Sequence, residues 1–100
     1  MQIPEKIKIG GYIYDCVLVS NLTRDDDTLG RSCGNALRIE IDDSLPHENK
    51  ESTLLHEILE QINYRYELCL EHKQITILES TLYQVIKDNP EIFLSQATKN

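Results

Sequence analysis

The stretch STLLHEILEQIN, from Ser52 to Asn63, decides how this 100-residue chain folds. It predicts one helix with a polar face, because His56 and Glu60 stand four residues apart and project from the same side. Glu57 follows His56 directly, and its side chain lies close enough around the helix to contribute to the same site. A stripe of apolar side chains would hold this helix against a core, and its members are Leu55, Ile58, Leu59, Ile62 and Tyr66.

The three polar residues match the H-E-x-x-H pattern, except that Glu60 replaces the second His. In that pattern two helix side chains bind a metal ion, and the first Glu is the general base that takes a proton from water. The placement of these residues favours a functional site, because three ionisable groups between apolar residues would be costly to bury without partners. The alternative is a solvated helix surface on which these groups have no role.

The first half of the chain, residues 1–45, predicts a small antiparallel sheet of three or four strands. Two runs rich in β-branched residues flank Gly10–Gly11, which is typical of a β-hairpin because glycine adopts the positive φ of a tight turn. A second pair of runs, at 29–33 and 36–41, alternates apolar and polar residues along its second member. Residues 21–28 between the pairs read as a polar loop, since their aspartates lack the spacing of a calcium site.

The second half, residues 46–95, predicts two main helices. The first would begin between His47 and Glu51 and run to about Leu70, with acidic residues at its positive N-terminal end. The second follows a short break and carries apolar residues at helical spacing up to Asn89–Pro90. At 100 residues the chain is therefore expected to be one α+β domain with a single core.

The second helix carries two further candidates for the site. Glu79 lies on the flank of its apolar stripe, and His72 stands seven residues earlier, so both would face similarly if the helix begins early. Antiparallel packing of the two helices would bring either side chain towards His56 and Glu60. The choice between Glu79 and His72 stays open at this point, and an exposed helix position is the alternative for each.

Charge and composition argue against several kinds of partner. The net charge of −7, with no basic run, argues against nucleic acid and against an anionic membrane surface, since both are bound through clustered Lys and Arg. No apolar run approaches the ~18 residues of a membrane span, and no signal core is present, so the cytoplasm is expected. The three cysteines are widely spaced without a C-x-x-C pair, and they read as reduced thiols, two of them buried.

Two segments of the chain resemble a group of small phage and prophage proteins. Members of this group carry a β-hairpin sheet, a helix with HEIxHA or HEIxEA, and a second helix ending in a pattern like LYQVxxDN. The corresponding segments read LHEILEQIN from Leu55 to Asn63 and LYQVIKDN from Leu82 to Asn89. The resemblance covers about Thr53 to Asn89, and the group is similar to minimal zincin-like metallopeptidases.

The resemblance implies a peptidase-like, metal-dependent hydrolase that acts on a peptide or protein. It implies that His56, Glu60 and Glu79 are the metal ligands and that Glu57 is the general base. An edge strand of the sheet would hold an extended peptide by strand addition. The implied cofactor is a divalent metal, zinc first, although two carboxylates with one imidazole favour harder metals such as manganese. Because Glu60 stands where the family has a second His, the alternative is a non-catalytic phage-derived interaction protein that keeps the fold.

Overall fold

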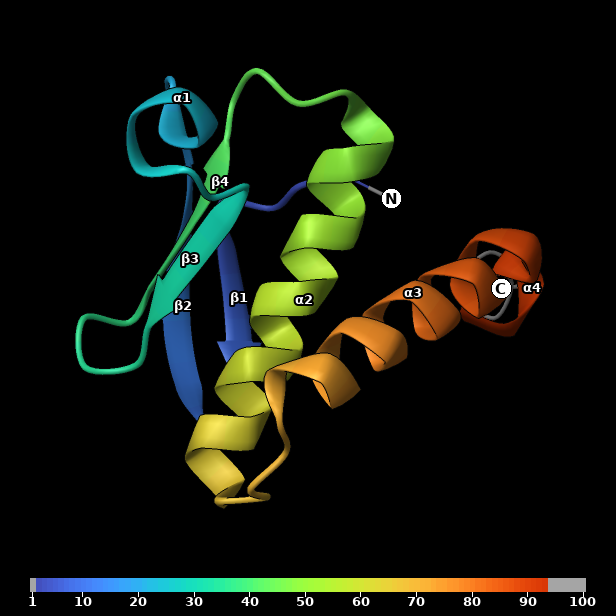
Figure 1. Ribbon diagram of the computed structural model, residues 1–100. Helices are drawn as coiled ribbons and strands as arrows, with labels where there is room; N and C mark the ends of the chain where they lie inside the picture. The colour runs from blue at the N-terminus through green and yellow to red at the C-terminus, as the bar shows by residue number, and fades with distance from the viewer. Residues whose placement is uncertain (1, 94–100) are drawn as a thin grey trace.

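The computed structural model describes residues 2–93, which form a four-stranded sheet, a long helix lying across it and a second helix leading away (Figure 1). The predicted α+β class, with strands preceding two main helices, is confirmed. Residues 94 and 95 of the expected helical half lie outside the described residues. In chain order the elements are β1 (Lys6–Ile9), β2 (Tyr12–Val19), α1 (Leu22–Asp26), β3 (Gly30–Cys33), β4 (Arg38–Asp42), α2 (His47–Tyr66), α3 (His72–Asp88) and α4 (Pro90–Phe93).

The strand order in the sheet is β1-β2-β4-β3, so the last strand in the sequence lies inside the sheet. The pairs β1–β2 and β3–β4 are antiparallel, but β2 and β4 run parallel, so the sheet is mixed and the prediction of a wholly antiparallel sheet is wrong. The reason lies in burial. β4 contributes Ile39 and Ile41, which are fully buried, whereas β3 consists of small and polar residues. The apolar strand therefore takes an interior place, and the polar strand takes the edge.

The segment predicted as a polar loop contains the short helix α1, which connects β2 to β3. Its Leu22 is buried. Asp42, also fully buried, accepts hydrogen bonds from the backbone N–H of Thr23 at 2.7 Å and from the backbone N–H and Oγ of Ser44, both at 2.8 Å. These bonds from Thr23 and Ser44 hold the pKa of the Asp42 carboxyl well below its usual range. A single apolar residue among polar neighbours gives no periodic signal, so the sequence did not indicate this helix.

The apolar side of α2 packs on the core of the sheet. Leu54 is buried there, and Ile58 and Ile62 pack against the cluster from positions one and two turns further along. The remaining buried members of this core are Ile9, Tyr14, Ile39 and Ile41. Tyr66, which was expected in the apolar stripe, is 59% exposed because α2 ends at that residue.

Towards β3 the buried face of α2 is polar, and glycine lets the strand approach it. Thr53, Glu57 and Gln61 are each no more than 6% exposed. A Cβ added to Gly30 would lie 2.5 Å from Cγ2 of Thr53, and one added to Gly34 would collide with the ring of Tyr64. The edge strand and the residue after it thus lie directly against side chains of α2, since neither glycine has a side chain that would hold the chain away from Thr53 or Tyr64.

The chain reverses direction between α2 and α3. α2 ends at Tyr66, before the expected Leu70, because Glu67 adopts a left-handed conformation with φ 51° and donates its N–H to the carbonyl of Asn63. The Asn63 side chain then bonds the backbone of Leu70, accepting from its N–H at 2.9 Å and donating to its carbonyl at 3.1 Å. These contacts fix the turn that follows α2.

α3 begins at His72 behind a capping box formed by Glu71 and Gln74. It packs on α2, with Ile75 buried near its start, and it leads away from the sheet towards α4 (Figure 1). The start of α3 therefore lies beside the middle of α2, where the motif residues stand.

Two further expectations concern the burial of the cysteines and the presence of a membrane-spanning helix. Cys16 is half-buried and Cys33 and Cys69 are exposed, all three as free thiols, so the expectation of two buried cysteines is wrong. Cys33 lies on the edge strand and Cys69 in the turn after α2, and neither place offers a core. Among residues 2–93, no helix has the length and apolar character needed to cross a bilayer.

Candidate metal centre

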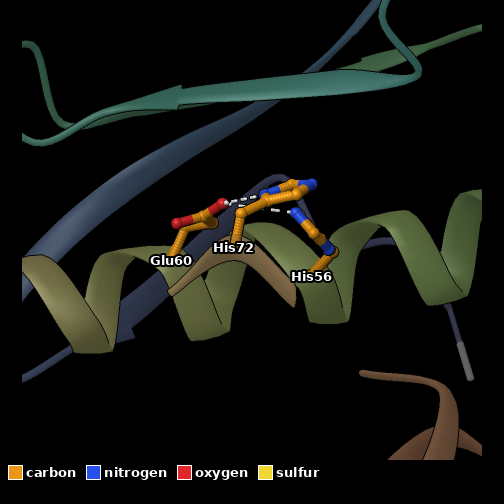
Figure 2. Close-up of side chains that lie close together, drawn as sticks. All are labelled: His56, Glu60 and His72. Carbon is orange, nitrogen blue, oxygen red and sulfur yellow. Dashed lines mark hydrogen bonds and ion pairs between the residues drawn. The ribbon is translucent and has the colours of Figure 1, made fainter. Parts of the chain in front are cut away.

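α2 and the first residue of α3 bring three donor side chains together. Nε2 of His56 lies 3.3 Å from Oε2 of Glu60, and Nδ1 of His72 lies 3.4 Å from the same oxygen. One donor atom from each residue lies within 4.8 Å of the other two. Figure 2 shows these three side chains in the space between α2 and β3. Three side chains of types that bind metal ions, two His and one Glu, therefore converge on one point beside the edge strand.

The spacing and chemistry of these donors fit a small divalent cation. A tetrahedral zinc ion with ligand bonds of about 2.0–2.2 Å needs donor atoms roughly 3.3–3.6 Å apart. The distances of 3.3 and 3.4 Å around Glu60 match this spacing. Two imidazoles and one carboxylate are a zinc set that leaves a fourth position open, and they favour zinc over harder metals such as manganese. His72 is 75% exposed, so a cation can reach the group from solvent.

Glu79 contacts the other ring nitrogen of His56. Its Oε1 lies 3.2 Å from Nδ1, whereas Glu60 lies beside Nε2. With a metal ion bound at Nε2, a carboxylate at Nδ1 would accept the ring N–H and orient the imidazole. The second helix thus brings both Glu79 and His72 to His56, and it is His72 that joins the three-donor group. The ligand role implied for Glu79 stays a prediction.

Glu57 is buried next to this group. It is 6% exposed, and its Oε1 accepts a hydrogen bond from Oγ of Ser32 at 2.8 Å. Burial raises the pKa of the Glu57 carboxyl, and the Ser32 bond offsets only part of that effect. A carboxyl with a raised pKa is suited to accept a proton in one step of a reaction and to return it in another.

The metal-binding candidates and Glu57 line an open cavity of about 600 Å³ between β3 and α2. A second cavity of about 310 Å³ shares Gly30, His56, Glu57 and His72 with the first. The first follows β3 along its whole length, and the second overlaps it at the Gly30 end and extends towards Asp27. β3 is an edge strand, which leaves its outer main-chain groups available to an extended ligand.

Four residues around Glu57 were not indicated as functional by the sequence. Besides Ser32, they are Gln61, Tyr14 and Arg65, which continue a hydrogen-bonded series away from Glu57. One signal was present: Glu57, Gln61 and Arg65 stand at steps of four along α2 and therefore share one face. No comparable signal marked Ser32 or Tyr14, because their positions depend on strand order.

Comparison of the chain with models of protein families, with curated proteins and with solved structures gives no match. The geometry of the site therefore carries the functional argument.

Proposed function

We propose that this protein is a zincin-like metal-dependent hydrolase that cleaves peptide bonds, and that His56, Glu60 and His72 hold its divalent cation, zinc first. The observation that carries the proposal is the convergence of three donor atoms at cation spacing next to a buried carboxylate. Isolated His–Glu ion pairs are common on helices. Here two imidazoles from different helices meet the same carboxylate oxygen, which a simple surface pair does not require.

The roles of the side chains follow from their positions. A divalent metal at this place would polarise a peptide carbonyl and make a water molecule easier to deprotonate. Glu57 takes the proton from that water and passes it to the leaving amine, a sequence for which its raised pKa is suited. Glu79 keeps the His56 ring oriented through Nδ1.

The substrate in this proposal is an extended peptide. β3 has a free edge, so a peptide can pair with it as an additional strand and pass over the cluster. The first cavity follows β3 along its length and the second continues beyond Gly30, which gives room for side chains on both sides of the bond to be cleaved. This arrangement favours cleavage within a chain over removal of a terminal residue.

The cellular setting is part of the same proposal. We assign the protein to the cytoplasm, in support of which Cys16, Cys33 and Cys69 are all free thiols, as expected in a reducing compartment. Assignment to phage-encoded proteins rests on the resemblance of residues 53–89.

The test is zinc-loaded wild-type protein beside Glu57→Gln, with fluorogenic hydrolysis of an unfolded protein and zinc content as the two readouts. We expect one zinc per chain in both proteins and a loss of hydrolysis of about 10²–10⁴-fold in Glu57→Gln. His47→Ala, which removes a histidine near the start of α2, is the control and should change neither readout. Absence of zinc from the wild type would contradict the proposal and favour the interaction protein. Equal hydrolysis by Glu57→Gln would contradict the role of Glu57.

A further inference from the structure

A chain of hydrogen bonds leads from Glu57 towards the end of α2. Oγ of Ser32 donates to Oε1 of Glu57 at 2.8 Å, and Nε2 of Gln61 donates to Oγ of Ser32 at 2.9 Å. The hydroxyl of Tyr14 donates to Oε1 of Gln61 at 2.7 Å, and Nε of Arg65 donates to the Tyr14 hydroxyl at 2.9 Å. These five residues from β2, β3 and α2 are called the Arg65–Glu57 relay.

The relay has one direction. Arg65 can only donate, so the single hydroxyl proton of Tyr14 goes to the carbonyl oxygen of Gln61. The amide nitrogen of Gln61 then faces Ser32, whose own proton goes to Glu57. Turning the Gln61 amide over would leave the Tyr14 hydroxyl facing two donors with no acceptor for its proton. The hydroxyl of Ser32 is therefore always the donor, and Oε1 of Glu57 is always the acceptor, in the last hydrogen bond of the relay.

Three of the five relay residues are buried, Ser32 and Arg65 are partly buried, and the relay is anchored at its outer end. Tyr14 is fully buried, and Gln61 and Glu57 are 5% and 6% exposed. At the outer end, Arg65 donates from Nη2 to the Gly34 carbonyl at 2.8 Å. Among the described residues, no buried side-chain nitrogen or oxygen lacks a hydrogen-bond partner. A buried network whose members are all satisfied holds its side chains in one arrangement.

We propose that the Arg65–Glu57 relay is a positioning device that fixes the orientation of the Glu57 carboxylate. By engaging Oε1, it directs Oε2 to take the proton from water. Ser32 belongs to β3, so the same bond ties the base to the strand that would pair with the peptide. The part of this inference that concerns proton transfer rests on the proposed function, whereas the orientation of Glu57 can be measured without any activity.

The placement of the Glu57 side chain, on which the orientation of its carboxylate depends, is measured by nuclear magnetic resonance. Cγ of Glu57 lies 3.6 Å from the place where a Cβ on Gly30 would stand, so the Hα protons of Gly30 are close to Hγ of Glu57. We expect a strong Overhauser effect between them in the wild type. Ser32→Ala and Tyr14→Phe should weaken it, and Ser32→Thr, which keeps the hydroxyl, should retain it.

Tyr83→Phe is the matched control for Tyr14→Phe. Tyr83 donates a hydrogen bond of 2.6 Å to Glu51, so this variant also loses a phenolic bond between two elements. It lies outside the relay and should leave the Overhauser effect and the hydrolysis rate unchanged.

The second readout is steady-state hydrolysis by the zinc-loaded proteins. We expect kcat to fall by about 10–100-fold in Ser32→Ala and Tyr14→Phe, with KM and zinc content unchanged, and to recover in Ser32→Thr. A merely structural role would lower Tm and leave kcat unaltered at temperatures well below Tm.

The outcomes separate the two proposals. An unchanged Overhauser effect in both Ser32→Ala and Tyr14→Phe overturns the relay, whatever the activity. A weakened effect with unchanged kcat overturns it as well. A weakened effect together with no hydrolysis by the zinc-loaded wild type supports the positioning of Glu57 and overturns the hydrolase.

Discussion

Gly30→Ala tests how closely β3 must approach α2 for the site to form. A Cβ at this position would lie 2.5 Å from Cγ2 of Thr53 and 3.0 Å from the carbonyl oxygen of Glu40. Thr53 is 6% exposed, so its methyl group lies within the contact between α2 and β3. The added methyl must therefore push β3 away from α2 and take Ser32 away from Glu57.

The expected cost follows from overpacking. Inserting a methyl group into a packed interior destabilises by about 1–3 kcal/mol. For a domain of this size each kcal/mol lowers Tm by roughly 4–8 °C. Gly30→Ala should therefore lower Tm by about 4–24 °C. Thr53→Ser removes the methyl group that would collide, so the double variant should be about 1–2 kcal/mol more stable than the two single variants predict by addition.

The assay is urea unfolding of the wild type, both single variants and the double variant, followed by zinc titration of each. His56, Glu60 and His72 all lie on α2 and α3, so zinc affinity should change little in Gly30→Ala, whereas hydrolysis should fall as Ser32 moves. Additive destabilisation, or a Gly30→Ala protein as stable as the wild type, would refute the contact between β3 and Thr53.

Three further predictions concern single side chains. The pKa of Asp42 lies well below its usual range, so its stabilising effect is present above the unfolded pKa of about 3.9 and is lost as pH falls through the folded pKa. Asp42→Asn should thus lower the free energy of unfolding at pH 7 and flatten its decline below pH 4. A difference in unfolding free energy between variant and wild type that is the same at every pH, measured by urea unfolding, would contradict this prediction. Burial and the bond to Glu51 raise the pKa of Tyr83 to about 12, so the stabilising effect of this phenol is present below the unfolded pKa of about 10 and is lost as pH rises towards 12. An ultraviolet titration should contain a phenol that ionises near pH 12 and that Tyr83→Phe removes; identical titrations would count against the bond. Glu79→Ala should weaken zinc binding by about 10–100-fold through misorientation of His56, whereas Glu79→Gln keeps a hydrogen-bond acceptor and should lose less. Equal, large losses would instead support Glu79 as a ligand.

The helix with the His56–Glu60 pair could be predicted because its features depend on spacing along one element. The meeting of His72 with Glu60 could not. It depends on a turn in which Glu67 and Cys69 both adopt positive φ, a conformation that few residues other than glycine take and that no residue type here indicated.

The strand pairs β1–β2 and β3–β4 could be predicted from local sequence patterns, whereas the pairing of β2 with β4 that joins them into one sheet could not. Hairpin signals are local, but the parallel contact of β2 with β4 depends on which strand has the more apolar face. The relay depends on that contact, because the strand order decides where Ser32 and Tyr14 lie relative to Gln61. Residues that act through strand order were therefore the ones the sequence did not indicate.

The most direct test of the metal centre is zinc affinity, measured by competition with a chromophoric chelator, for the wild type, His56→Ala, His72→Ala and His47→Ala. We expect one zinc per wild-type chain, a loss of at least about 100-fold in His56→Ala and His72→Ala, equivalent to about 2.7 kcal/mol, and no change in His47→Ala. A wild-type protein that takes up no zinc, or a His72→Ala protein that binds as tightly as the wild type, would contradict the centre described.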